Sequence, residues 1–181
     1  MKNEKLNLRQ RMYGLVPYNI SPIQQGIQFG HAVVEYSLKN HLSNEYLNWA
    51  KYDKTFIILN GGTTNKSKSS LGTLNSHAAL LKDMGIEIAE FYEPDLGDQL
   101  TAVVFLVDER VWDRESHPSF AEFLRPFQDI VDTYRDSNLS FEGVVKRLEE
   151  EQPTVYRDWV DRIGGKKNEF LTYFLKNFKL A

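Results

Sequence analysis

The pattern of apolar and polar positions predicts a chain that begins with alternating strands and helices and ends in helices alone. Alternating or compact apolar runs predict four strands, and two longer amphipathic runs between them predict helices. In chain order these segments are a strand at 12–18, a helix at 22–39, a strand at 55–59 buried on both faces, a helix at 71–84 that ends at Gly85, and strands at 86–92 and 100–107. The order β-α-β-α-β-β predicts an α/β domain with a mixed sheet over residues 12–111.

The first predicted helix has the clearest sequence signals. Ser21 suits the N-cap and Pro22 the first helical position. Three apolar residues at i, i+4 and i+11 are expected to form its buried face: Ile23, Ile27 and Val34. Three polar residues at i, i+4 and i+7 share another face: Gln24, Gln28 and His31. This second face is a candidate site, because it places two amides and an imidazole beside a helix N-terminus that favours anions.

Residues 112–181 have a different character and predict an all-helical C-terminal extension. Helix starts are expected at Ser116, Ser140 and Pro153, the first helix running to Val131. In the last helix aromatic residues recur at i, i+4 and i+8 and are expected to be core: Phe170, Phe174 and Phe178. The extension is therefore expected to pack on the sheet domain or on a second copy of the chain.

Composition narrows the classes of protein that fit. The chain has 181 residues with 41% hydrophobic content, which is enough for a real core, and a formal net charge of −3, which does not fit a general nucleic-acid binder. The absence of cysteine excludes disulfides and thiolate chemistry. The polar N-terminal residues and the lack of a long apolar run lead us to expect a cytoplasmic protein that does not enter the membrane.

Two loops carry further candidate chemistry. The acidic turn at residues 93–98 could hold a hard cation through Glu93, Asp95 and Asp98, but a solvated turn is the better interpretation, and the four histidines lack a paired metal spacing. We therefore expect neither a metal nor a cofactor. The loop at residues 61–70 lacks the Walker pattern, which leaves Lys66 either as an anion-binding residue or as part of an ordinary surface connection.

Residues 12–111 resemble the archaeal and eukaryotic, or type 2, peptidyl-tRNA hydrolases. The resemblance depends on Gln28-x-x-His31-Ala32-Val33 in the first helix and on the acidic turn at residues 92–95 before the last strand. It covers a little over half of the chain, and the helical extension has no counterpart in that family. It implies a domain that hydrolyses the ester between a peptide and the terminal ribose of tRNA, in which Gln28 and Glu93 match the family's glutamine and acid.

The chain lacks the lysines that the family carries in and before its first helix. The family's lysine four residues before the glutamine corresponds to Gln24, and the upstream lysines correspond to Pro22 and Asn19. Without these charges, affinity for a large polyanion falls by several powers of ten. Neutral amides at a helix N-terminus better suit a small nucleotide.

These observations assign roles to eight residues. The expected catalytic residues are Gln28, His31, Glu93 and Asp95, with Glu93 or His31 as the base and Asp95 orienting it. The alternative for His31 is a packing role between the helix and the sheet. The expected ligand-binding residues are Gln24, Asn19, Thr101 and Lys66. The leading hypothesis is a hydrolase for a nucleotide-linked ester or phosphodiester, with a nucleotide or a tRNA-derived ligand. The alternatives are a protein that binds and sequesters or cleaves a small nucleotide signal such as a cyclic oligonucleotide, and a non-catalytic assembly module that oligomerises through the helical tail.

Overall fold

The computed structural model describes residues 8–67, 69–127, 132 and 140–181, and it divides the chain into two compact units. The first contains the residues up to Glu109 together with Tyr173–Ala181, and the second contains Arg110–Thr172. The last nine residues of the chain thus belong with the sheet rather than with the helical unit. The expected end of the first helix of the extension, at Val131, lies outside the described residues.

The first unit is a mixed α/β fold built on a four-stranded mixed sheet. Its strand order is β2-β1-β4-β3, with β1 and β2 parallel and the other two pairs antiparallel. Its elements, in chain order, are β1 (Gln10–Val16), α1 (Pro22–Asn40), α2 (Asn44–Asn48), the π-helical turn η1 (Trp49–Asp53), β2 (Phe56–Asn60), α3 (Thr73–Asp83), β3 (Ile88–Glu93), the 3-10 turn η2 (Pro94–Leu96) and β4 (Gln99–Asp108).

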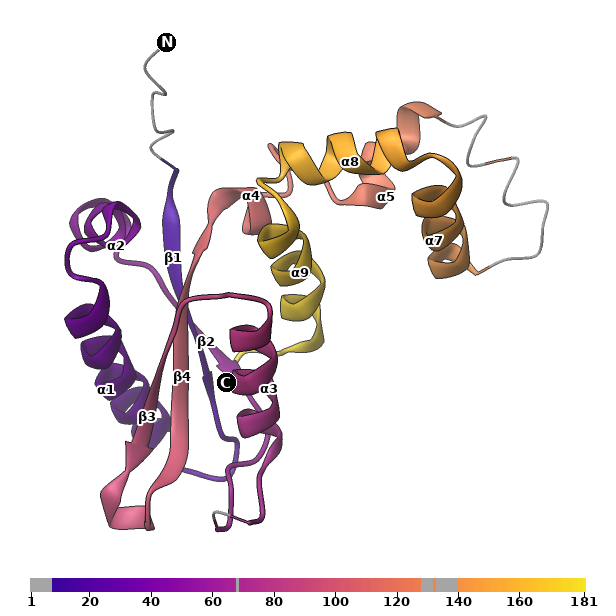
Figure 1. Cartoon of the computed structure of the whole chain (residues 1–181). Helices are drawn as coiled ribbons and strands as arrows, with labels where there is room; N and C mark the ends of the chain where they lie inside the picture. Colours follow the sequence, from indigo (N-terminus) through magenta and orange to yellow (C-terminus); the bar gives the residue numbers. More distant parts are fainter. Residues whose placement is uncertain (1–7, 68, 128–131, 133–139) are drawn as a thin grey trace. The chain divides into compact units, whose positions relative to one another are not determined.

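Helices cover both faces of this sheet, with α1 on one side and α3 on the other (Figure 1). The α1 side has a core formed by α1 residues such as Phe29, Ala32 and Tyr36 against Val104 of the central strand β4. Gly14 of β1 leaves the space that the Phe29 ring occupies, since a Cβ at this position would lie 2.3 Å from ring atoms. The position of α1 is therefore fixed by close packing on the sheet.

The structure confirms the start of α1 and corrects its expected buried face. Ser21 is the N-cap and Pro22 opens the helix, as predicted. Ile23, Ile27 and Val34 are instead 77%, 51% and 57% exposed. The buried residues lie on the opposite side of the helix: Gln28, Phe29, Ala32 and Tyr36. Periodicity shows that an apolar stripe exists, but α1 has two such stripes, and the larger aromatic one packs on the sheet.

Strand β2 also differs from expectation, because it is not buried on both faces. Phe56 is 50% exposed, while Leu59 is buried. The reason is that β2 is an edge strand of the sheet. The last residues of the chain pair with it, through hydrogen bonds from Asn60 N to Lys179 O (2.9 Å) and from Ala181 N to Ile58 O (3.0 Å).

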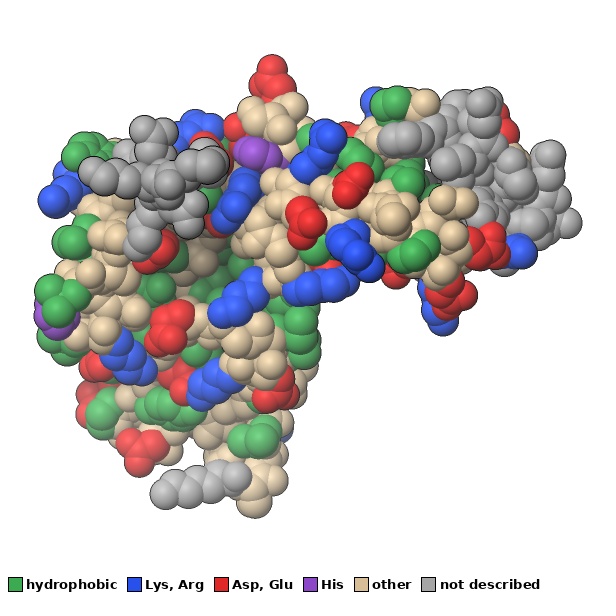
Figure 2. All heavy atoms as spheres, turned by 45° about the horizontal axis from the view of Figure 1, so that its top comes forward, with side chains coloured by type: hydrophobic (Ala, Val, Ile, Leu, Met, Phe, Trp, Pro, Cys, Tyr) green, Lys and Arg blue, Asp and Glu red, His purple; other side chains and the backbone are tan. Residues whose placement is uncertain are grey.

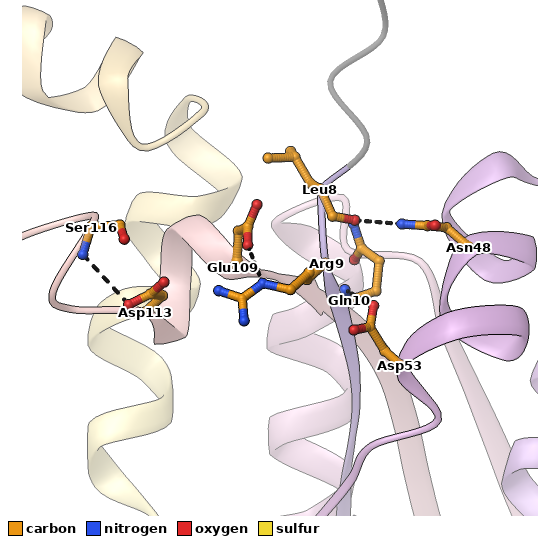
Figure 3. Close-up of polar contacts among 8 residues, drawn as sticks. All are labelled: Leu8, Arg9, Gln10, Asn48, Asp53, Glu109, Asp113 and Ser116. Carbon is orange, nitrogen blue, oxygen red and sulfur yellow. Dashed lines mark hydrogen bonds and ion pairs between the residues drawn. The ribbon is translucent and has the colours of Figure 1, made fainter.

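Side-chain contacts fix the start of β1 (Figure 3). Asn48 Nδ2 donates to Leu8 O at 2.6 Å, and the Arg9 guanidinium forms an ion pair with Glu109 at 2.6 Å. The first contact joins β1 to α2, and the second joins it to the end of β4. Both restrain the strand from which α1 departs.

The helical unit has its own small core, formed by Phe120, Leu124, Leu148, Trp159, Val160 and Ile163. The indole N–H of Trp159 donates to Pro118 O at 3.0 Å, which satisfies a polar group inside that core. The helical segments that follow β4 are α4 (Glu109–Trp112), α5 (Phe120–Phe123), the 3-10 turn η3 (Arg125–Phe127), α7 (Phe141–Glu151), α8 (Pro153–Arg162), α9 (Lys166–Phe174) and the 3-10 turn η4 (Leu175–Asn177). The end of α9 and η4 return the chain to the first unit.

The aromatic residues at the end of the chain pack on helix α3. The ring of His77 lies edge-on to Phe174 and Phe178, with centroids 5.8 and 4.9 Å away. Burial lowers the pKa of His77, so its imidazole is a neutral packing residue at pH 7. These aromatic side chains therefore stabilise the first unit itself.

Candidate functional site

Three polar side chains that are distant in sequence meet between α1 and the β3–β4 hairpin. Gln28 Nε2 donates to Glu93 Oε2 at 2.6 Å, and Thr101 Oγ1 donates to Gln28 Oε1 at 2.8 Å. Gln28 is 7% exposed and Thr101 is fully buried, whereas Glu93 is half-buried at the end of β3. The Gln28 amide thus links a buried hydroxyl to a carboxylate that reaches solvent.

A β-bulge explains why Thr101 points at α1. Phe91 pairs with Ala102 and Tyr92 pairs with Leu100, so Thr101 has no partner opposite it on β3. In a regular strand, neighbouring side chains point to opposite faces. Here Ala102 packs in the core on the α1 side, and Thr101 also reaches that side to bind Gln28. A bulge commonly re-aims a side chain in this way next to a functional site.

The turn after Glu93 holds one oxygen of its carboxylate. Glu93 Oε1 accepts a long hydrogen bond of 3.4 Å from the backbone N–H of Asp95, at the start of η2. The turn then closes through Gly97 and Asp98, both with positive φ, and Asp98 N donates to Glu93 O at 3.1 Å. Asp95 therefore orients Glu93 through its backbone, while its own carboxylate is exposed to solvent.

His31 lies over the strand that leads to Glu93. Its ring stacks on Phe91, with centroids 4.6 Å apart and planes at 21°. Phe91 O also accepts a hydrogen bond of 3.3 Å from the Thr101 hydroxyl. His31 is exposed, so the stacked pair forms an aromatic surface two residues before the carboxylate.

Gln24 and Asn19 are placed differently from the residues just described. The Gln24 side chain belongs to the capping box of α1, where its Oε1 accepts from Ser21 N and Ser21 Oγ, both at 3.0 Å. Asn19 is exposed in the connection between β1 and α1. The amide at the position of the family's lysine is therefore engaged in capping the N-terminus of α1.

The loop that carries Lys66 is anchored on the residue before Thr101. Asn65 Oδ1 accepts from Leu100 N at 2.9 Å, and the Thr64 hydroxyl donates to Leu100 O. Both side chains are buried, at 6% and 8% exposure, whereas Lys66 is exposed. Nothing in the sequence marks Thr64 or Asn65 as special. A Thr-Asn pair after a strand is a common loop sequence, and only the fold shows that it caps the start of β4.

The chemistry available at this site is that of an oriented carboxylate and a neutral amide. A carboxylate held by two hydrogen bonds can accept a proton from water, and an amide N–H can polarise a carbonyl or phosphoryl oxygen. Among the described residues, no group of three or more His, Asp or Glu side chains could hold a metal ion. The site is thus defined by Gln28, Glu93 and Thr101, with the His31–Phe91 surface beside it.

The helical unit has a pocket of its own, which has no signal in the sequence. Its volume is about 280 Å³, and its polar lining residues are Ser116, His117 and Arg162. The Arg162 guanidinium lies 5.2 Å from the centre of the Phe123 ring, so it is already engaged in a cation–π contact. We place the candidate site at Glu93 instead, where the two residues matched by the family resemblance are in contact.

Comparison with known proteins does not assign the chain to a family. No family model matches the chain, and no curated protein matches it either. Within the described part of the chain, no helix has the length and apolar content needed to cross a membrane. The function is therefore inferred from the geometry of the site.

Proposed function

We propose that residues 12–111 form a divergent domain of the type 2 peptidyl-tRNA hydrolase kind, which hydrolyses a nucleotide-linked ester or phosphodiester. One observation carries the proposal: the 2.6 Å hydrogen bond between Gln28 and Glu93. These are the two residues that the resemblance assigns to the family's site, and the sequence separates them by 65 positions. Their contact supports a shared role, because neither residue is needed to complete the apolar core.

In the proposed reaction Glu93 acts as the general base. Its carboxylate accepts a proton from water, which attacks the ester carbon or the phosphorus of the ligand. The C–O or P–O bond to the leaving group then breaks, and the proton held by Glu93 passes to the leaving oxygen. The amide nitrogen of Gln28 carries a second N–H, which in this proposal donates to the ligand oxygen that becomes negative. Thr101 acts as a positioning residue, since its buried hydroxyl fixes which end of the Gln28 amide faces Glu93.

The environment of α1 favours a small ligand over intact tRNA. The position of the family's lysine is occupied by Gln24, which is engaged with Ser21 in the helix cap. The residues next to Glu93 in the turn add the negative charges of Asp95 and Asp98. Each missing phosphate contact weakens binding and its salt dependence, so a ligand with one or a few phosphates suits the site best.

The neutral Gln24 in place of the family's lysine also favours a second candidate function. In this function the site binds a small nucleotide signal, such as a cyclic oligonucleotide, without cleaving it. The exposed ring of His31, stacked on the half-buried Phe91, offers an aromatic surface on which a base can stack. Binding and hydrolysis are distinguished by the fate of the ligand, since a sequestered ligand is returned intact when the protein is denatured.

The test is a mass-spectrometric assay of the full chain with N-acetylaminoacyl-tRNA and with cyclic and linear oligonucleotides. New products that disappear with Glu93→Gln identify a hydrolase and the bond it breaks. A ligand that leaves the free pool and returns unchanged on denaturation supports sequestration instead. If no compound is either changed or retained, the proposed site has neither function for these ligand classes.

A further inference from the structure

Helix α1 has a second apolar face, opposite the face that packs on the sheet. Its large side chains are more than half exposed at Ile23, Ile27, Val34 and Leu38, and Leu42 follows just after the helix at 81% exposure. Figure 2 shows hydrophobic side chains along the left edge of the molecule, the side on which Figure 1 places α1. A helix that is apolar on opposite sides is expected to be covered on both.

The outer face of α1 is uncharged over most of its length, and two glycines leave its centre without side chains. Residues 22–34 contain no Asp, Glu, Lys or Arg. Gly26 and Gly30 lie within the face, and nothing is found within 4 Å of a Cβ built on either of them. A second helix can therefore approach the backbone of α1 closely at this point, as small residues allow at other helix–helix contacts.

We propose that this face of α1 is a homodimer interface, in which two copies of the chain pack antiparallel about a two-fold axis at Gly30. An isologous contact brings residues that lie about equally far from the axis, in opposite directions, beside each other. Ile27 then meets Val34 of the second copy, three to four residues from Gly30, and Ile23 meets Leu38, seven to eight residues away. Each large apolar residue of the face thus finds a large apolar partner.

The same register extends beyond the helix and creates no conflict of charge. Tyr18, which is 59% exposed, lies twelve residues before Gly30, and Leu42 lies twelve residues after it. The two charged residues at the C-terminal end of α1, Glu35 and Lys39, lie at the level of residues 21–26 of the second copy, none of which is charged. Antiparallel helices also place the positive end of one dipole beside the negative end of the other.

The area of the face suits a dimer of modest stability. The largest apolar patch on a typical monomer covers about 300–600 Å², and five large residues exposed by at least 51% reach the upper part of that range. Two such patches in contact approach the roughly 1,200 Å² at which stable interfaces begin. The second copy is the occupant that this symmetric, uncharged surface fits.

Single cysteines provide a direct test, because the chain has none of its own. Gly30→Cys places two thiols at the axis, and we expect a disulfide-linked dimer under mild oxidation. Leu38→Cys is the matched control. Its two copies lie about 24 Å apart in the antiparallel register, far beyond the roughly 4.4–6.8 Å between Cα atoms that a disulfide spans. Cross-linking of both variants, or of neither, would overturn the proposed arrangement.

Mass in solution tests the same interface without cysteine. The wild-type chain is expected to be dimeric at 100 µM by light scattering. Ile27→Glu is expected to raise the dimer dissociation constant by at least about tenfold, because it buries a carboxylate in the contact. Leu80→Glu, at a 42% exposed position on α3, should leave it unchanged, and circular dichroism checks that both variants fold. A monomeric wild type, or an equal effect of the two variants, would refute the interface.

Discussion

The hydroxyl of Thr101 lies 2.8 Å from Oε1 of Gln28, although 73 residues separate them in the chain. Because Gln28 Nε2 donates to Glu93, this contact sets the orientation of the amide at the candidate site. It exists because the bulge in β4 turns Thr101 toward α1. The bulge in β4 thus positions the Gln28 side chain of α1 and, through it, the Glu93 carboxylate at the end of β3.

Thr101→Val should remove the donor that fixes Gln28. It leaves the buried Gln28 oxygen without this hydrogen bond, and we expect a loss of about 1–3 kcal/mol in the free energy of unfolding. Thr101→Ser keeps the hydroxyl and is the matched control. Urea denaturation compares the two variants. A Thr101→Val protein as stable as Thr101→Ser would show that the contact does not matter.

Glu93→Gln should separate chemistry from binding. The amide has nearly the same shape as the carboxylate but cannot accept a proton from water, so we expect turnover to fall by at least about 100-fold. Asp98→Asn, an isosteric change at the exposed turn, is the matched control and should retain turnover. A Glu93→Gln variant with wild-type turnover would exclude Glu93 as the base.

Two alanine substitutions, Phe174→Ala and Leu180→Ala, test the packing of the C-terminal residues on the sheet unit. Phe174 is 6% exposed and contacts His77, so Phe174→Ala should cost about 3–5 kcal/mol. Leu180 is 74% exposed, and Leu180→Ala should change stability by less than about 0.5 kcal/mol. Thermal or urea unfolding measures both. Equal effects would argue against the packing described for this segment.

Glu169 in the helical unit should make stability depend on pH. Burial, with a further contribution from Glu149, raises the pKa of Glu169 from 4.5 to about 7. Lys166 Nζ lies 2.8 Å from the carboxylate and opposes this rise, but its side chain is 68% exposed, so water screens its charge.

The direction of the effect follows from proton binding. Between pH 4.5 and 7 the folded state holds a proton that the unfolded state has released, so the contribution of Glu169 is complete below pH 4.5 and is lost as pH rises toward 7. Glu169→Gln should therefore show a smaller fall in melting temperature between pH 5 and pH 8 than the wild type, by about 2–4 °C. Identical pH profiles would contradict a raised pKa at this residue.

The sequence predicts much of the sheet unit because its signals are local. Ser21 and Pro22 show where α1 begins, and Gly85 follows the end of α3, as the structure confirms. Tertiary context decides the rest. The exposure of Ile23 depends on which apolar face of α1 meets the sheet, and the exposure of Phe56 depends on β2 being an edge strand.

The candidate site was predictable in its residues but not in its geometry. Gln28 and Glu93 come from the resemblance to a known family, and the structure brings them into contact. Thr101 was expected to meet the ligand; in the structure its side chain is fully buried and donates a hydrogen bond to Gln28. The reason is the bulge, which has no sequence signal here, because nothing in the run around Thr101 marks an extra residue.

The measurement that tests the central claim most directly is product analysis with wild-type protein, Glu93→Gln and Asp98→Asn in parallel. Each is incubated with N-acetylaminoacyl-tRNA and with cyclic and linear oligonucleotides, and the mixtures are analysed by mass spectrometry before and after denaturation. The account predicts that wild type and Asp98→Asn cleave one nucleotide-linked bond and that Glu93→Gln does not. Cleavage by all three proteins, or no cleavage and no retention of any compound by the wild type, would contradict it.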